Sequence, residues 1–316
     1  MTPDIDATHL DAHAEEIVPV QNTRSPIANI FKGPNGIRAG WRLLIFIALF
    51  MAMVRGIGLI PAVHAFAQAQ DRQTMTPGSL VLLEGVSVLC LVVAAFVMSL
   101  IEKKSFADYY LPPNQAFGKR FWQGVPYGFA MLSLLLVLIA AFRGFSLGGW
   151  ALSGADALKY GALYGIGFIL VGLFEEFSFR GYMQSTLTSA IGFWWAAAIL
   201  STLFGAGHLQ NLGEAWIGAL MAGSFGILAA FSLKRTGNIW FPIGMHAAWD
   251  WGETYFYSVP DSGFLAKGHL LNSTFHGPTW LTGGTVGPEG SVFALVVLVI
   301  GGVGIHFLFP AKQQTV

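Results

Sequence analysis

The chain has 316 residues, of which 54% are hydrophobic and only 11% are charged. That charged share is less than half of what a soluble domain carries, so the composition favours a membrane protein and disfavours a soluble one. The 17 basic and 17 acidic residues cancel, which gives no electrostatic basis for binding nucleic acid. The single cysteine, Cys90, excludes an intrachain disulfide and any multi-cysteine metal site.

Residues 1–40 are polar and acidic, with prolines and no sustained apolar face. They predict a disordered cytoplasmic tail and no cleavable signal peptide. Residues 41–316 predict a transmembrane domain, with a peptidase-like core at about 125–255 and an extramembrane loop at about 258–290. Its apolar runs predict eight helices, at roughly 41–64, 79–101, 121–142, 160–188, 191–211, 213–233, 237–257 and 291–309.

Only helices satisfy their own backbone hydrogen bonds in lipid, so the expected fold is an all-α, polytopic transmembrane bundle of about eight helices. Basic residues are concentrated before the first span, between the second and third, and between the sixth and seventh. By the positive-inside tendency, both termini are expected in the cytoplasm. No internal repeat is visible, so the sequence lacks the pattern of an inverted-repeat transporter.

The expected fourth span contains a dense group of ionisable residues, in the sequence FEEFSFR at 174–180. Such residues are costly inside a membrane unless they are paired or face a cavity. Glu176 and Arg180 are four residues apart on one helix face, in the favourable order for an ion pair. Glu175 is turned about 100° away and lacks this partner, so Glu175 is the carboxylate expected to be free for chemistry.

Two later spans each contribute histidine. His208 ends the fifth span after Gly205, Ala206 and Gly207, small residues that let another helix or a peptide backbone come close. In the seventh span, His246 and Asp250 are four residues apart on one face. That spacing suits either two ligands of one metal ion or a histidine oriented by a carboxylate.

The depths of these residues are compatible with one site. If the chain turns near Ala190 and near Thr236, the rise per residue places Glu175, His208 and the pair in the seventh span at heights of about 15–27 Å from one membrane face. This convergence requires the fourth helix to continue past Arg180 to about residue 188. Two other charged residues have structural interpretations: Glu84 is expected to pair with Arg55, and Glu253 is expected at the membrane interface.

In order and spacing, Glu175-Glu176-x-x-x-Arg180, Phe204-x-x-x-His208 and His246-x-x-x-Asp250 resemble the three motifs of the CAAX-protease and bacteriocin-processing family. This family of intramembrane endopeptidases, also called Abi, includes the type II CAAX prenyl endopeptidases. The resemblance covers roughly residues 125–255. It implies that Glu175 is the general base, that His208 shares that role, and that His246 supports the oxyanion. Glu176, Arg180 and Phe204 would be supporting residues.

The last position of the third motif is often Asn in that family, and here it is Asp250. An ionised Asp accepts hydrogen bonds only, so an oxyanion-hole role is disfavoured, and orienting His246 or binding a metal gains weight. Two mechanisms stay open. In one, Glu175 and His208 activate water without metal; in the other, His208, His246 and Asp250 bind zinc, as in a metalloprotease.

The implied partners are a peptide or protein substrate and membrane lipid, with no nucleic acid. The resemblance allows CAAX processing of prenylated peptides, cleavage of leader peptides, or intramembrane proteolysis of other membrane-associated chains. Two other classes of function are compatible with buried ionisable residues: a non-catalytic membrane scaffold or immunity-like protein, and an ion or proton transporter.

Overall fold

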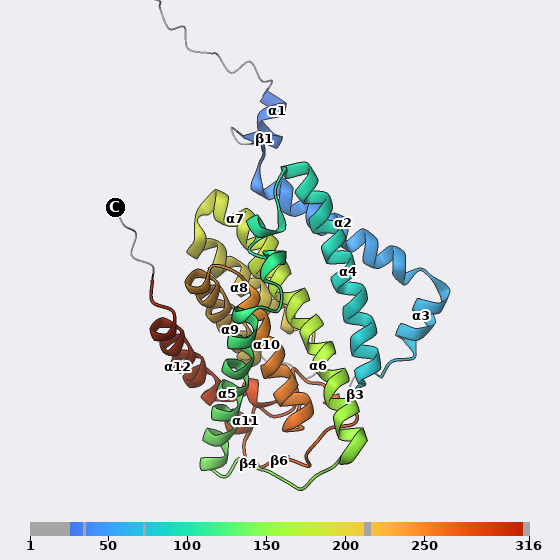
Figure 1. Cartoon of the computed structure of the whole chain (residues 1–316), viewed down its shortest axis with the longest axis vertical. Coiled ribbons are helices and arrows are strands. Elements are labelled where there is room, and N and C mark those ends of the chain that lie inside the picture. The colour runs from blue at the N-terminus through green and yellow to red at the C-terminus, as the bar shows by residue number, and fades with distance from the viewer. Residues whose placement is uncertain (1–25, 34–35, 72–73, 212–215, 312–316) are drawn as a thin grey trace, which may run out of the picture. The chain divides into compact units, whose positions relative to one another are not determined.

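The computed structural model describes residues 26–33, 36–71, 74–211 and 216–311 (Figure 1). The disordered tail expected over residues 1–40 falls mainly on residues 1–25, outside the described residues. Residues 26–38 contain helix α1 (Pro26–Phe31) and the antiparallel strands β1 (Lys32–Gly33) and β2 (Gly36–Ile37). A separate compact unit begins at Ala39.

The unit from Ala39 onward is almost entirely helical, which confirms the all-α expectation. Its longer helices are α2 (Ala39–Gly58), α3 (Pro61–Gln68), α4 (Pro77–Glu102), α5 (Lys119–Ala141), α6 (Gly154–Glu176), α7 (Gln184–Ile191), α8 (Phe193–His208), α9 (Trp216–Thr236), α10 (Trp240–Trp251) and α12 (Val292–Leu308). Two π-helical segments, η3 (Phe177–Met183) and η4 (Gly252–Phe256), directly follow α6 and α10.

Within the described part of the chain, five helical stretches are long and apolar enough to cross a membrane: α2, α4, α5, α9 and the stretch Gly154–Ile191. The chain is therefore a multi-pass integral membrane protein. The expected count of eight is not confirmed, because α8, α10 and α12 have only 16, 12 and 17 residues. The first expected span is also divided: α2 ends at Gly58, and Pro61, which has no amide hydrogen, begins α3.

The fourth span continues past Arg180, as the convergence of the site requires. Helices α6 and α7 are joined through η3, and the combined stretch ends at Ile191. Gly192 then takes a positive φ of 81°, which glycine adopts without strain. Gly237, with a φ of 85°, makes the corresponding turn between α9 and α10. Both turns lie within a few residues of the expected positions.

Helix α10 carries the third motif and is buried over its whole length from Trp240 to Asp250. It packs against α5 and α6, on either side of it in Figure 1. Glycines make the approach to α5 possible, because a Cβ on Gly124 or Gly128 would overlap carbonyl oxygens of α10. Close backbone contact on both sides fixes the position of this short helix.

The loop between α10 and α12 folds back onto the helices. Strand β5 (Leu265–Ala266) pairs in parallel with β3 (Thr74–Met75), next to the start of α4. Strand β6 (Thr274–Phe275) pairs antiparallel with β4 (Phe145–Ser146), which follows α5. The short helix α11 (Thr279–Thr282) and the 3₁₀ turn η5 (Pro288–Gly290) complete the loop. These contacts bring loop side chains to the cavity that the motifs line.

Candidate active site

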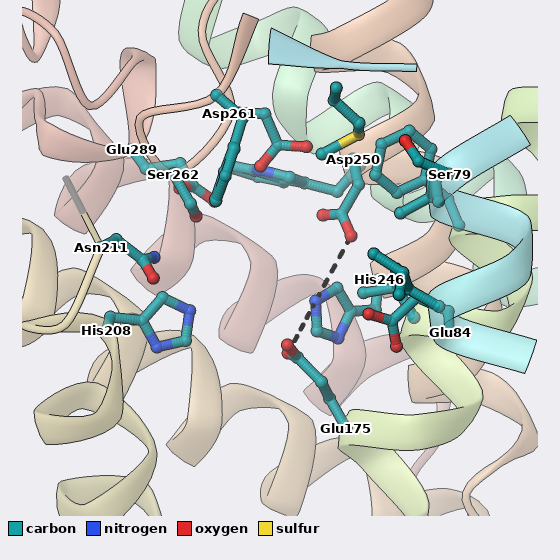
Figure 2. A pocket seen from close by; sticks show the side chains of 18 of the residues that line it. Ser79, Glu84, Glu175, His208, Asn211, His246, Asp250, Asp261, Ser262 and Glu289 are labelled. Atoms are coloured by element: carbon teal, nitrogen blue, oxygen red, sulfur yellow. Dashed lines mark hydrogen bonds and ion pairs between the residues drawn. The ribbon is translucent and has the colours of Figure 1, made fainter. Parts of the chain in front are cut away.

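A cavity of about 320 Å³ lies between α4, α6, α8, α9, α10 and the folded loop. All four residues expected to carry the chemistry line it: Glu175, His208, His246 and Asp250. Figure 2 shows His208 across the cavity from Glu175 and His246. Three separate stretches of sequence therefore meet at one hollow that is large enough for a small peptide segment.

Glu175 lies in the last turn of α6 and reaches the cavity. Its side chain is 26% exposed, and its Oε2 lies 3.5 Å from His246 Nε2. That separation is longer than a direct hydrogen bond, so the contact is an ion-pair approach that leaves the carboxylate able to accept a proton from water.

Glu176 points away from the cavity and is completely buried. Its Oε1 lies 3.2 Å from Arg180 Nη1, with the two side chains 0% and 2% exposed. The same oxygen lies 2.9 Å from His246 Nδ1. The ion pair expected from the sequence is thus present, and its carboxylate also holds Nδ1 of the His246 ring.

Phe204 contacts both the Glu176–Arg180 ion pair and the two site histidines. The Arg180 guanidinium lies over the Phe204 ring, 4.4 Å from its centroid. The same ring meets the His208 ring edge-on at 4.7 Å and the His246 ring at 6.5 Å. Phe204 therefore separates the buried ion pair from the cavity and restricts both imidazoles.

His246 has polar neighbours on both ring nitrogens. Nδ1 faces Glu176, while Nε2 faces Glu175 and also lies 3.6 Å from Asp250 Oδ2, one helical turn further along α10. The Phe225 ring packs against it with centroids 5.0 Å apart. The ring is therefore held in one orientation, with Nε2 directed at the cavity.

His208 is oriented by its own helix. Its Nδ1 lies 2.9 Å from the carbonyl oxygen of Phe204, one turn earlier in α8. A carbonyl only accepts, so Nδ1 carries the proton in this contact, and Nε2 of a neutral ring is left as a proton acceptor toward the cavity.

Both π-helical segments adjoin the site. Segment η3 begins one residue after Glu176, and η4 begins two residues after Asp250. π-helical turns are rare and occur frequently at functional sites, because the wider turn shifts the register of the side chains that follow. Here η3 directly follows Glu175 and Glu176, and η4 follows the turn that carries His246 and Asp250.

Residues 142–252 match the sequence model of the protein family described as type II CAAX prenyl endopeptidase Rce1-like. This segment, called the matched segment below, is therefore similar to that family. It includes the residues of all three motifs, so the resemblance seen in the sequence is confirmed over this part of the chain. It indicates a peptidase of the CAAX intramembrane protease type. No curated protein matches the chain.

The matched segment does not bring His208, His246 and Asp250 together as three ligands of one metal ion. Among the described residues, the only acidic, histidine or cysteine ligand atoms found in threes within 4.8 Å of one another belong to Glu253, Asp261 and Glu289. His208, His246 and Asp250 do not form such a group, although His246 Nε2 lies 3.6 Å from Asp250 Oδ2.

Four acidic residues that the sequence did not assign to the site also line the cavity: Asp71, Glu84, Asp261 and Glu289. Glu84 forms no ion pair with Arg55 in the described part of the chain, and its Oε2 has no hydrogen-bond partner there. The position of Glu84 inside an apolar span is the sequence signal that could have indicated a place in the site. Burial, together with the Glu289 carboxylate, raises the pKa of Asp261 to about 7.

Proposed function

We propose that the chain is an intramembrane endopeptidase that hydrolyses peptide bonds with a water activated by Glu175 and His208. The observation that carries this proposal is the shared cavity, in which an acid, two imidazoles and a further carboxylate from three motifs face one space. Peptide hydrolysis needs an activated water and a stabilised oxyanion, and these residues supply both kinds of group.

Glu175 is the general base, and His208 assists it from the opposite wall. The half-open position of Glu175 gives water access to its carboxylate. His208 Nε2 accepts a proton because Nδ1 is engaged with the Phe204 carbonyl. Glu176 is excluded from this role, since it is fully buried and occupied by Arg180 and His246.

His246 stabilises the oxyanion. Carboxylates face both ring nitrogens, so His246 acts as the imidazolium: Nδ1 donates to Glu176, and the second proton, on Nε2, is directed into the cavity, where the carbonyl oxygen of the substrate would lie. Asp250 lies beside Nε2 and, as a carboxylate, can only accept. Asp250 therefore acts as a positioning residue for His246.

The reaction conserves atoms and charge. The water oxygen forms a bond to the carbonyl carbon while its proton passes to Glu175 or His208. The carbonyl π electrons move to oxygen, which His246 stabilises. When the carbonyl re-forms, the C–N bond breaks, and the captured proton is delivered to the leaving nitrogen. No step is routed through a metal.

The substrate is a membrane-associated peptide or protein that reaches the cavity from the lipid. A prenylated C-terminal peptide and a leader peptide are the two substrate classes to be compared. Both termini of the enzyme are assigned to the cytoplasm from the distribution of basic residues.

Cleavage of a peptide library by purified protein in nanodiscs tests the proposal. Glu175→Gln should lose cleavage by at least about 100-fold, the usual contribution of a general base. Asp156→Asn, which alters an exposed carboxylate in the first turn of the same helix, should cleave as the wild type does. Wild-type rates in the Glu175→Gln protein would refute the assignment, and intact fold is checked by unchanged thermal unfolding.

The zinc mechanism predicts a different result. Metal analysis would then find one zinc per chain, and the zinc chelator 1,10-phenanthroline would abolish cleavage. Under the metal-free mechanism, cleavage should persist with the chelator. Alanine at all four site positions with the cellular phenotype retained would instead support a scaffold, and ion flux in proteoliposomes would support transport.

A further inference from the structure

A second group of acidic side chains lies just beyond residues 142–252, where the folded loop meets the end of α10. Ligand atoms of Glu253, Asp261 and Glu289 all lie within 4.8 Å of one another. They come from η4, from the segment after it, and from η5. Figure 2 shows Asp261 and Glu289 on the side of the cavity away from Glu175.

Glu253 is the feature that distinguishes this group from an ordinary acidic surface. The sequence places it at the membrane interface, but its side chain is 0% exposed. Neither of its carboxylate oxygens has a hydrogen-bond partner of normal geometry in the described part of the chain, and the Trp249 side chain is the donor beside it. A fully buried carboxylate with two unpaired oxygens is costly unless an opposite charge compensates it.

The described ion pairs supply no such charge from a side chain. None of them joins Lys, Arg or His to any of these three carboxylates. The nearby His246 is engaged by Glu175, Glu176 and Asp250 instead. The group therefore brings three acidic side chains together with no ion-pair partner among the described residues.

The other two carboxylates are oriented as ligands usually are. The Thr254 hydroxyl donates to Asp261 Oδ2 at 2.6 Å, and the Ser262 hydroxyl donates to Glu289 Oε2 at 2.9 Å. Among the described residues, no hydrogen bond engages the second oxygen of either carboxylate. Such outer hydrogen bonds fix the direction of a metal-binding carboxylate.

The backbone around the group is also fixed. The Val259 amide donates to the Glu253 carbonyl, and the Gly263 amide donates to the Val286 carbonyl, both at 3.0 Å. Gly287, with a φ of 113°, passes so close that a Cβ there would lie 2.9 Å from Glu253 Oε1. The loop thus encloses the carboxylates.

We infer that Glu253, Asp261 and Glu289 form a binding site for a hard divalent cation of the calcium type, which fastens the folded loop to the end of α10. Three carboxylates without histidine or cysteine favour a hard cation over zinc. Calcium–oxygen distances are about 2.4 Å, so ligand atoms up to 4.8 Å apart can lie on opposite sides of one ion. The shorter bonds of magnesium demand a tighter group.

Terbium luminescence and thermal unfolding test this inference directly. Tb³⁺ replaces Ca²⁺ at oxygen sites, and Trp249 lies one helical turn before Glu253, close enough to sensitise it. Wild-type protein in nanodiscs should show Tb³⁺ emission that Ca²⁺ displaces. Glu253→Gln should weaken Tb³⁺ binding at least tenfold, and Asp261→Asn should do the same.

Added Ca²⁺ should change which of the two proteins, wild type or Glu253→Gln, melts at the higher temperature. After removal of cations with EDTA, Glu253→Gln should melt at or above the wild-type temperature, because it removes an uncompensated buried charge. With added Ca²⁺, the wild type should gain several degrees and the variant should gain none. Glu175→Gln should keep the wild-type response, so a failed peptidase proposal leaves this result intact.

Three outcomes would overturn the inference. The first is absence of Tb³⁺ emission together with no Ca²⁺ effect on melting, which would mean that protons alone neutralise the group. The second is a Ca²⁺ response that persists in both Glu253→Gln and Asp261→Asn. The third is a larger response to Mg²⁺ or Zn²⁺ than to Ca²⁺.

Discussion

The contact between α8 and α9 gives a sharp test of how the fold positions His208. Gly205 and Gly207 lie two residues apart on α8, just before His208, yet their surroundings differ. A Cβ on Gly205 would overlap the Ala219 carbonyl oxygen and lie 3.0 Å from the Gly223 amide nitrogen, whereas ordinary contacts begin at 3.4 Å. A Cβ on Gly207 would have nothing within 4 Å.

Gly205→Ala should therefore force α8 and α9 apart by about 1 Å, because a packed interior cannot absorb the overlap. Overpacking of this kind costs about 1–3 kcal/mol of stability. A displacement of about 1 Å at a catalytic group can reduce the rate about 100-fold. Gly207→Ala adds the same methyl group to the same helix without an overlap, so it should leave the cleavage rate unchanged and raise stability by up to about 1 kcal/mol, the usual gain from Gly to Ala in a helix.

The assay combines peptide cleavage in nanodiscs with thermal unfolding of the same samples. The expected pattern is a lower melting temperature and slower cleavage for Gly205→Ala alone. Equal behaviour of the two variants would refute the reasoning, since it would show that close contact with α9 does not position His208.

Two further predictions concern buried charge. Arg180→Met removes one of the two groups paired with the buried Glu176 and leaves only His246, which should destabilise the protein by about 3–5 kcal/mol; denaturant unfolding measures this, and a change below about 1 kcal/mol would contradict it. Glu84→Gln removes a carboxylate whose Oε2 has no partner in the described structure and which faces the same cavity as Glu175. It should raise the melting temperature, and a clear fall would show that Glu84 has a stabilising partner.

Much of the site could be predicted from the sequence because its signals are local. Ionisable residues stand out inside apolar spans, and helical spacing alone places Glu176 with Arg180 and His246 with Asp250. The continuation of the fourth helix past Arg180 was also expected, and the structure contains it.

Other features depend on contacts between distant segments. The bond from His246 to Glu176 joins residues 70 positions apart, and no spacing rule indicates it. Asp261 and Glu289 look like ordinary charges of an outer loop, and only the strand pairs that fold this loop back bring them to the cavity. The π-helical segments were not predicted, because one wide turn barely changes the hydrophobic periodicity.

The size of the cavity constrains what can be cut. An α-helix with its side chains is about 10–12 Å across, and a hollow of about 320 Å³ holds only a short length of chain. Under the proposed function, a membrane-spanning helix would have to unwind near the scissile bond for its backbone to reach Glu175, or a free chain end would have to enter instead. Ease of local unwinding would then decide which membrane proteins are cut, as much as the identity of the side chains around the bond.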